Sequence, residues 1–175
     1  FIVTFRSHLN KSTPPHPTHV GAALQVLEAI TTQQQAADSA LQTYYTAHKN
    51  SGANDRRHIS GMVYGVLRAM ITLRWQSDNS AASCLAAWLQ ARGQLVDSYP
   101  LPASAFAAAR ALKPLAQAPE AVQHGVPAWL YAPLQATWGT QAAAVAAASL
   151  EAAPVDLRVN TLLTTRQQAL ASLRQ

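Results

Sequence analysis

The stretch from Asn54 to Trp75 constrains this chain more than any other, because its apolar residues recur with a single period. They lie three or four positions apart: Ile59, Met62, Val63, Val66, Leu67, Met70 and Ile71. This spacing places them on one face of an α-helix and fits no other regular structure. Asn54 or Asp55 is expected to cap the helix start by accepting from its free backbone N–H groups.

The face opposite the apolar stripe is basic. Five cations lie between Tyr44 and Trp75 against Asp55 alone, so this stretch holds four of the five units of formal net charge, +5. Such a surface suits a polyanionic partner, and we expect it to contact RNA phosphates. The candidate RNA-binding residues are Lys49, Arg56, Arg57, Arg68, Arg74, Tyr64 and Arg158. Two alternatives remain open: a solvated face neutralised by acids from elsewhere, and arginines that tie this helix to its neighbours.

The sequence from residue 18 to residue 152 has helical patterns joined by short links, which predicts an all-α helical bundle. Further helices are expected at 18–31, 36–49, 81–92, 103–112, 126–138 and 140–152. Gly52 is expected to end one helix with a positive φ, Gly93 to end another, and Pro114 to stop a third. Residues 1–17 have no sustained period and are expected to form a loose leader.

The pattern changes at Pro154. From there to Leu162 apolar and polar residues alternate, which is the period of a half-buried strand. Thr165 to Gln168 has a capping-box pattern for a following helix. One strand and one helix cannot satisfy their own backbone edges or cover their own face. We therefore expect 153–175 to be the truncated start of a following α/β domain, and the chain to be a fragment.

The sequence contains no recognisable catalytic, cofactor-binding or metal-binding motif. The single cysteine, Cys84, excludes an intramolecular disulfide, and its apolar neighbours predict a buried thiol. His16 and His19 lack cysteine or carboxylate neighbours at metal-ligand spacing, so no metal site is expected. No apolar run approaches the ~20 residues that cross a bilayer, and no signal peptide is recognisable, so we expect a cytoplasmic protein without a membrane partner.

Four motifs, in order, resemble those of bacterial 16S rRNA (cytosine-C5)-methyltransferases. D-R-R-x-I-S-x-x-V-Y-G-V-L-R, from Asp55 to Arg68, resembles the signature helix of their N-terminal NusB-like domain. The block A-P-x-D-L-R-V-N-T-L followed by T-T-R resembles the entry to their second region. V-L-E-A-I at 26–30 and P-x-W-L at 127–130 complete the set. The resemblance extends from Val20 to Gln175.

The resemblance implies that the NusB-like helical domain docks 16S ribosomal RNA for a catalytic domain absent from this chain. That domain would bind S-adenosylmethionine and methylate cytosine C5 through two cysteines in Pro-Cys motifs. Cys84 has no adjacent proline, so no catalytic role transfers to it. No cofactor is expected in this chain, and DNA is not an expected partner. Tyr64 or Trp75 is a candidate for stacking on an unpaired base, although each is also a candidate packing residue.

Two other functions remain open on the sequence. One is a stand-alone NusB-like factor that binds RNA or protein in transcription antitermination. The strand pattern at 154–162 argues against it, because a complete helical factor does not need an unpaired strand. The other is a helical protein-interaction domain without RNA affinity, whose binding to structured RNA would not depend on Arg56 and Arg57.

Overall fold

The computed structural model describes residues 2–5, 14–151 and 155–173, and it is predominantly helical. The chain divides into two compact units: a helical unit within Ser12–Glu151, and a smaller unit formed by Phe1–Lys11 and Ala152–Gln175. The predicted all-α class is confirmed for the described residues.

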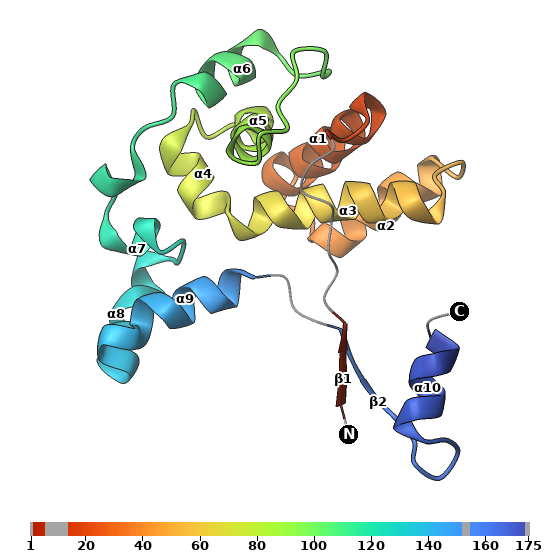
Figure 1. Ribbon diagram of the computed structural model, residues 1–175. Coiled ribbons are helices and arrows are strands. Elements are labelled where there is room, and N and C mark those ends of the chain that lie inside the picture. The colour runs from red at the N-terminus through yellow and green to blue at the C-terminus, as the bar shows by residue number, and fades with distance from the viewer. Residues whose placement is uncertain (1, 6–13, 152–154, 174–175) are drawn as a thin grey trace. The chain divides into compact units, whose positions relative to one another are not determined.

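The helical unit contains nine described α-helices and two short 3₁₀ turns (Figure 1). The first five helices are α1 (Pro17–Thr32), α2 (Ala37–Ala47), α3 (Ala53–Arg68), α4 (Met70–Gln76) and α5 (Ala81–Ala91). The remaining elements are α6 (Ala103–Arg110), η1 (Leu115–Gln117), α7 (Glu120–Gln123), α8 (Ala128–Trp138), η2 (Gly139–Gln141) and α9 (Ala142–Leu150). Most of these helices lie within a few residues of the expected ranges, whereas η1 and α7 were not predicted.

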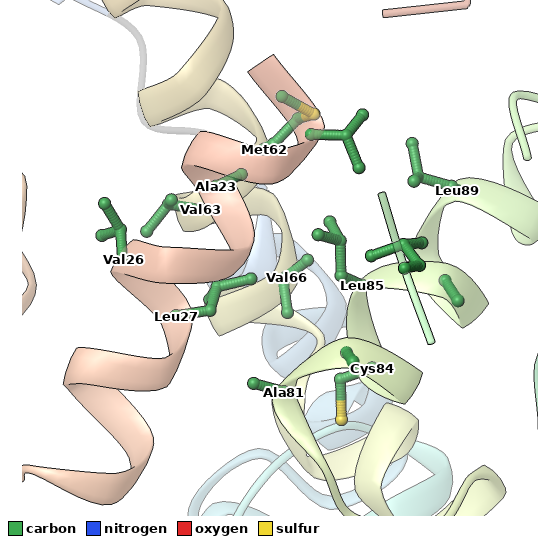
Figure 2. Packing of buried hydrophobic residues seen from close by; sticks show 14 of the residues in the cluster. Ala23, Val26, Leu27, Met62, Val63, Val66, Ala81, Cys84, Leu85 and Leu89 are labelled. Carbon is green, nitrogen blue, oxygen red and sulfur yellow. The ribbon is translucent and has the colours of Figure 1, made fainter. Parts of the chain in front are cut away.

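The main core lies where α1, α3 and α5 meet, with α6 packed against α5 (Figure 2). Its fully buried side chains include Val26, Leu27, Val63, Val66, Leu85 and Leu89. Most other buried positions of α5 are alanines, whose small side chains permit close helix packing. The helices α1 and α3 therefore each bury one face in this core, whereas α5 is buried on nearly all sides.

The predicted helix from Asn54 to Trp75 is wrong in its continuity, because the chain turns at Ala69 between α3 and α4. The Ala69 N–H donates to Val66 O at 3.1 Å, and the Thr72 hydroxyl donates to Ala69 O at 2.8 Å. The turn lets α4 pack on α5 and buries Leu73, which is not in the predicted stripe. Packing of α4 against α5 thus outweighs the regular apolar spacing, which predicted one continuous helix.

The start of α3 also differs from the prediction. The N-cap is Gly52, rather than Asn54 or Asp55, and its φ of −69° is not the positive value expected for a helix stop. Asp55 lies in the first turn, where its carboxylate accepts from the Gly52 N–H at 2.9 Å. A carboxylate is favourable there because it meets free N–H groups at the positive end of the helix dipole.

The predicted helix end at Gly93 is confirmed, because Gly93 follows α5 with a φ of +67°. Its N–H donates to Gln90 O, and the next N–H, that of Gln94, donates to Leu89 O, each at 2.9 Å. These two bonds form a Schellman motif, which satisfies carbonyl groups left free by the last turn. Glycine adopts this left-handed conformation without the steric cost of a Cβ.

A second, smaller apolar cluster joins α7, α8 and α9. It is formed by Ala121, Val126, Tyr131 and Ala146, with Leu134 packed against it. The Tyr131 hydroxyl donates to Glu120 Oε1 at 2.7 Å, which links α7 to α8. The helix α8 continues through Pro133, although proline cannot donate its backbone hydrogen bond.

The smaller unit contains β1 (Ile2–Phe5), β2 (Val155–Arg158) and α10 (Arg166–Leu173). The two strands pair antiparallel, with Ile2 opposite Arg158. The loose-leader prediction for 1–17 is therefore wrong at residues 2–5, and α1 already begins at Pro17. Residues 6–13 lie outside the described part, as do residues 152–154 at the predicted domain boundary.

The pairing of β1 with β2 has a physical reason. The segment I-V-T-F is rich in β-branched and aromatic residues, which favour strands, and it satisfies one edge of β2. The expected unpaired strand is therefore paired within this chain. The predicted capping box of α10 is confirmed, because Gln168 N donates to Thr165 Oγ1 at 3.3 Å and Thr165 N donates to Gln168 Oε1 at 3.0 Å.

The contact between Gly65 and Trp88 provides a test of the α3–α5 packing. A Cβ at Gly65 would lie 2.5 Å from Trp88 Cζ2 and 2.9 Å from Cε2. We expect Gly65→Ala to lower the free energy of unfolding by about 1–3 kcal/mol through overpacking. Urea denaturation followed by circular dichroism measures this loss.

The matched control is the same substitution in a Trp88→Leu background, which removes the ring. There the higher helix propensity of alanine, worth about 1 kcal/mol, should make Gly65→Ala neutral or stabilising. Equal losses in the two backgrounds would contradict the proposed steric cause.

Candidate nucleic-acid interface

The predicted cations of the helical unit lie on or beside α3 and α4. Lys49 follows α2, Arg56 and Arg57 lie in the first turns of α3, Arg68 ends α3, and Arg74 lies in α4. All except the half-buried Arg68 are exposed. Among the described residues, none of these five forms an ion pair. Their charges are therefore not neutralised by direct acidic partners in that part of the chain.

Arg56 and Arg57 are each held by one hydrogen bond. Arg56 Nε donates to Ser51 O at 3.1 Å, and its Cζ lies 5.1 Å from the centroid of the Tyr45 ring. Arg57 Nη2 donates to Asn54 Oδ1 at 2.8 Å. Since a guanidinium has five N–H donors, both side chains retain several donors for phosphate oxygens. The fixed positions also reduce the entropy that binding would cost.

Asp55, the one acidic residue in the basic stretch, is bound on both sides. Besides the Gly52 N–H, its carboxylate accepts from His19 Nε2 at 2.9 Å, which ties the start of α1 to the start of α3. The Gly52 backbone hydrogen bond, followed by that from His19, lowers the pKa of Asp55 below its usual 3.8. The His58 ring stacks on His19 with centroids 5.6 Å apart. Asp55 thus stabilises the start of α3 rather than neutralising the adjacent arginines.

A groove of about 590 Å³ lies between α2 and α3. The two helices run beside each other in opposite directions (Figure 1). The groove is lined by Asp38, Leu41, Gln42, Tyr45, Thr46 and Lys49 from the α2 side and by Arg56, Ser60 and Tyr64 from α3. Of the predicted set, it brings together Lys49, Arg56 and Tyr64, whereas Arg57, Arg68 and Arg74 do not line it.

The two tyrosines of the groove are held by hydrogen bonds. The Tyr45 hydroxyl donates to Arg56 O at 3.0 Å and lies 2.9 Å from Ser60 Oγ, so it joins α2 to α3. The Tyr64 hydroxyl donates to the Asp38 carboxylate, and this bond is the first cause that raises the pKa of Tyr64 above 10.0. Both rings also pack against the main core. They are therefore rigid, partly buried walls of the groove.

Sequence reasoning missed the contribution of α2 to this site. Asp38, Gln42, Tyr45 and Lys49 recur at helical spacing along one side of α2, beside its apolar residues. This spacing predicts that the four residues share one face of α2. Only the structure shows that this face lies opposite Arg56, Ser60 and Tyr64.

The other candidate residues have separate surroundings. Trp75 is half-buried, and Lys113 Nζ lies 5.9 Å from the centroid of its ring. Arg158 is exposed on β2, in the smaller unit. Cys84 is fully buried, and burial raises the pKa of its thiol, which confirms the predicted buried cysteine.

Within residues 2–5, 14–151 and 155–173, no three His, Cys, Asp or Glu side chains gather into a metal-binding group. None of the helices described there combines the length and hydropathy that a transmembrane span requires.

The bonds of Asp55 predict a pH-dependent contribution to stability. Because its pKa is lowered in the folded state, the stabilisation is present above pH 3.8 and is lost as the pH falls through the folded pKa. We expect Asp55→Asn to unfold at a lower urea concentration than the wild type at pH 7. Urea titrations between pH 7 and pH 3 should show that the difference between the two urea midpoints shrinks below pH 3.8.

Glu28→Gln, which removes a carboxylate from the exposed side of α1, is the control and should show no such convergence. A gap between Asp55→Asn and wild type that stays constant down to pH 3 would contradict the assigned role.

Comparison with known proteins found a similarity to a family model. Residues 126–175 match the family model described as Methyltr_RsmF/B-like, ferredoxin-like domain. The matched range contains α8, η2, α9, β2 and α10, and it begins before the strand at which the sequence pattern changes. Neither the curated proteins nor the solved structures contain a match. The C-terminal part of the chain is thus similar to a domain of RsmF/B-like rRNA methyltransferases.

Proposed function

We propose that this chain is the N-terminal RNA-binding portion of an S-adenosylmethionine-dependent rRNA (cytosine-C5)-methyltransferase. In this proposal residues 18–152 form a NusB-like domain that docks 16S rRNA, and residues 153–175 begin the following domain. The observation that carries the proposal is the methyltransferase-family match at 126–175. The exposed cations on and beside α3, which form no ion pair within the described part of the chain, support the RNA-docking role.

Docking by this surface would be electrostatic. Lysine and arginine side chains that neutralise phosphates release counterions, which supplies affinity and orientation with little sequence choice. Lys49, Arg56 and Arg57 are the first candidates, because they cluster around the link between α2 and α3. Arg68 and Arg74 would extend the contact along the RNA, and Arg158 is a separate candidate contact in the smaller unit. The half-buried position of Arg68 suits it to fewer phosphate contacts.

The residues of this chain do not fit a methyl-donor site. Its seven glycines do not gather into a loop, and the nearest pair, Gly61 and Gly65, lies inside α3. Cys84, the single cysteine, is buried in the helical core and is not available as a nucleophile. The proposal therefore assigns cofactor binding and methyl transfer to the catalytic domain of the parent protein, and no step of the reaction to this chain.

A stand-alone NusB-like factor is the alternative. The match to a methyltransferase-family domain favours the first function, because it extends over residues 153–175, which a factor without an attached enzyme does not need. The reading frame of the source gene tests this point. We expect it to continue past the Gln175 codon into a Gly-rich loop and two Pro-Cys motifs. A stop codon within a few residues would favour the alternative.

The RNA-docking role predicts salt-sensitive binding. We expect the Arg56→Glu/Arg57→Glu variant to bind a labelled 16S rRNA hairpin more weakly than the wild type. Loss of about two phosphate contacts should reduce the slope of log K against log salt by about 1.4–1.8. Fluorescence anisotropy at several KCl concentrations measures both effects.

Arg92→Glu is the control, because it reverses a charge at the residue that follows α5, outside the α2–α3 surface. This variant should keep the wild-type slope. If the double variant retained both affinity and slope, the helical protein-interaction function would replace the RNA-docking role.

A further inference from the structure

The groove between α2 and α3 has opposite chemistry at its two ends. Because the helices are antiparallel, Lys49 and Arg56 lie at the end next to the α2–α3 link, while Asp38 and Tyr64 lie at the other. Arg56 and Tyr64 are separated by two turns of α3, which is about 12 Å along the helix axis. One end thus offers cationic donors, and the other offers a carboxylate acceptor.

This polarity does not suit a groove that binds only a phosphate backbone. A backbone presents anionic oxygens at every nucleotide, and the Asp38 carboxylate repels them. The polarity does suit an unpaired nucleotide, whose phosphate is an anion and whose base edge carries N–H donors. An unpaired base also exposes the Watson–Crick edge that a duplex buries.

The Asp38 carboxylate has capacity for a ligand. It accepts from the Tyr64 hydroxyl through one oxygen, and no other group among the described residues donates to it. An ionised carboxylate has about four acceptor positions, so most of them remain open. The Tyr64 hydroxyl fixes the orientation of the carboxylate, and Gln42, one turn further along α2, offers an amide at the same wall.

We propose that this groove binds an unpaired nucleotide of the RNA, with its phosphate at Lys49 and Arg56 and a base bearing an exocyclic amino group at Asp38. The inference rests on the proposed RNA-docking function and adds a base preference to it. A carboxylate accepts from an amino group such as N4 of cytosine. Uracil lacks this group, and its N3–H lies between two carbonyl oxygens that repel the carboxylate.

The full chain and two labelled RNA 12-mers, C12 and U12, test the preference by fluorescence anisotropy at pH 7.5. We expect the wild type to bind C12 at least five times more tightly than U12. It should also bind C12 more tightly than the C12·G12 duplex, which conceals its base edges. Asp38→Asn, whose amide oxygen still accepts from Tyr64, should reduce the ratio of C12 to U12 affinity below two.

Glu28→Gln is the matched control, because it removes the same charge from an exposed position on α1, outside the groove. It should keep the fivefold ratio of C12 to U12 affinity, since a general loss of negative charge strengthens the binding of both RNAs equally. Circular dichroism confirms that each variant is folded.

Two results would overturn the inference: equal wild-type affinity for C12 and U12, or a preference that Asp38→Asn leaves unchanged. In either case the RNA-docking function would still stand if binding remained salt-dependent and sensitive to Arg56→Glu/Arg57→Glu. A wild-type chain that binds neither single-stranded nor hairpin RNA would remove both the base preference and the docking function.

Discussion

Close packing of α3 against α1 and α5 is the interaction on which the rest of the helical unit depends. The absence of a side chain at Gly65 allows the Trp88 ring to lie directly on α3, and alanines on α5 bring the helices together elsewhere. Protein interiors tolerate little extra volume, so this contact fixes the rotation of α3 about its own axis. That rotation decides which side chains of α3 remain at the surface.

The exposed side of α3 therefore carries a defined set of charges. Arg56 is held on Tyr45 and Arg57 on Asn54, while Asp55 is bound to His19 and to the helix start. Only about one residue in eight of the chain is charged, 12% in all, so few acids are available to neutralise the arginines. Among the described residues, the cations on and beside α3 consequently remain outside ion pairs.

The groove beside α3 combines this charge with rigid aromatic walls. Hydrogen bonds fix both tyrosine hydroxyls, so the groove has its shape before any ligand binds. Such preorganisation reduces the entropic cost of association.

In the proposed assignment the helical unit orients RNA while methyl transfer belongs to a separate domain. The buried Cys84 and the family match at the C-terminal part are both compatible with that division.

The sequence by itself determined most of the helices, their approximate ends and the basic side of α3, since these depend on local periodicity and on capping residues. It also indicated β2 and the capping box of α10. Tertiary structure decided the turn at Ala69, which depends on packing of α4 against α5, and the pairing of β1 with β2, which joins residues some 150 positions apart. It also decided that Asp38 of α2 lies beside Tyr64 of α3. A single helix period shows which residues share a face, but the element that this face meets depends on how the whole chain packs.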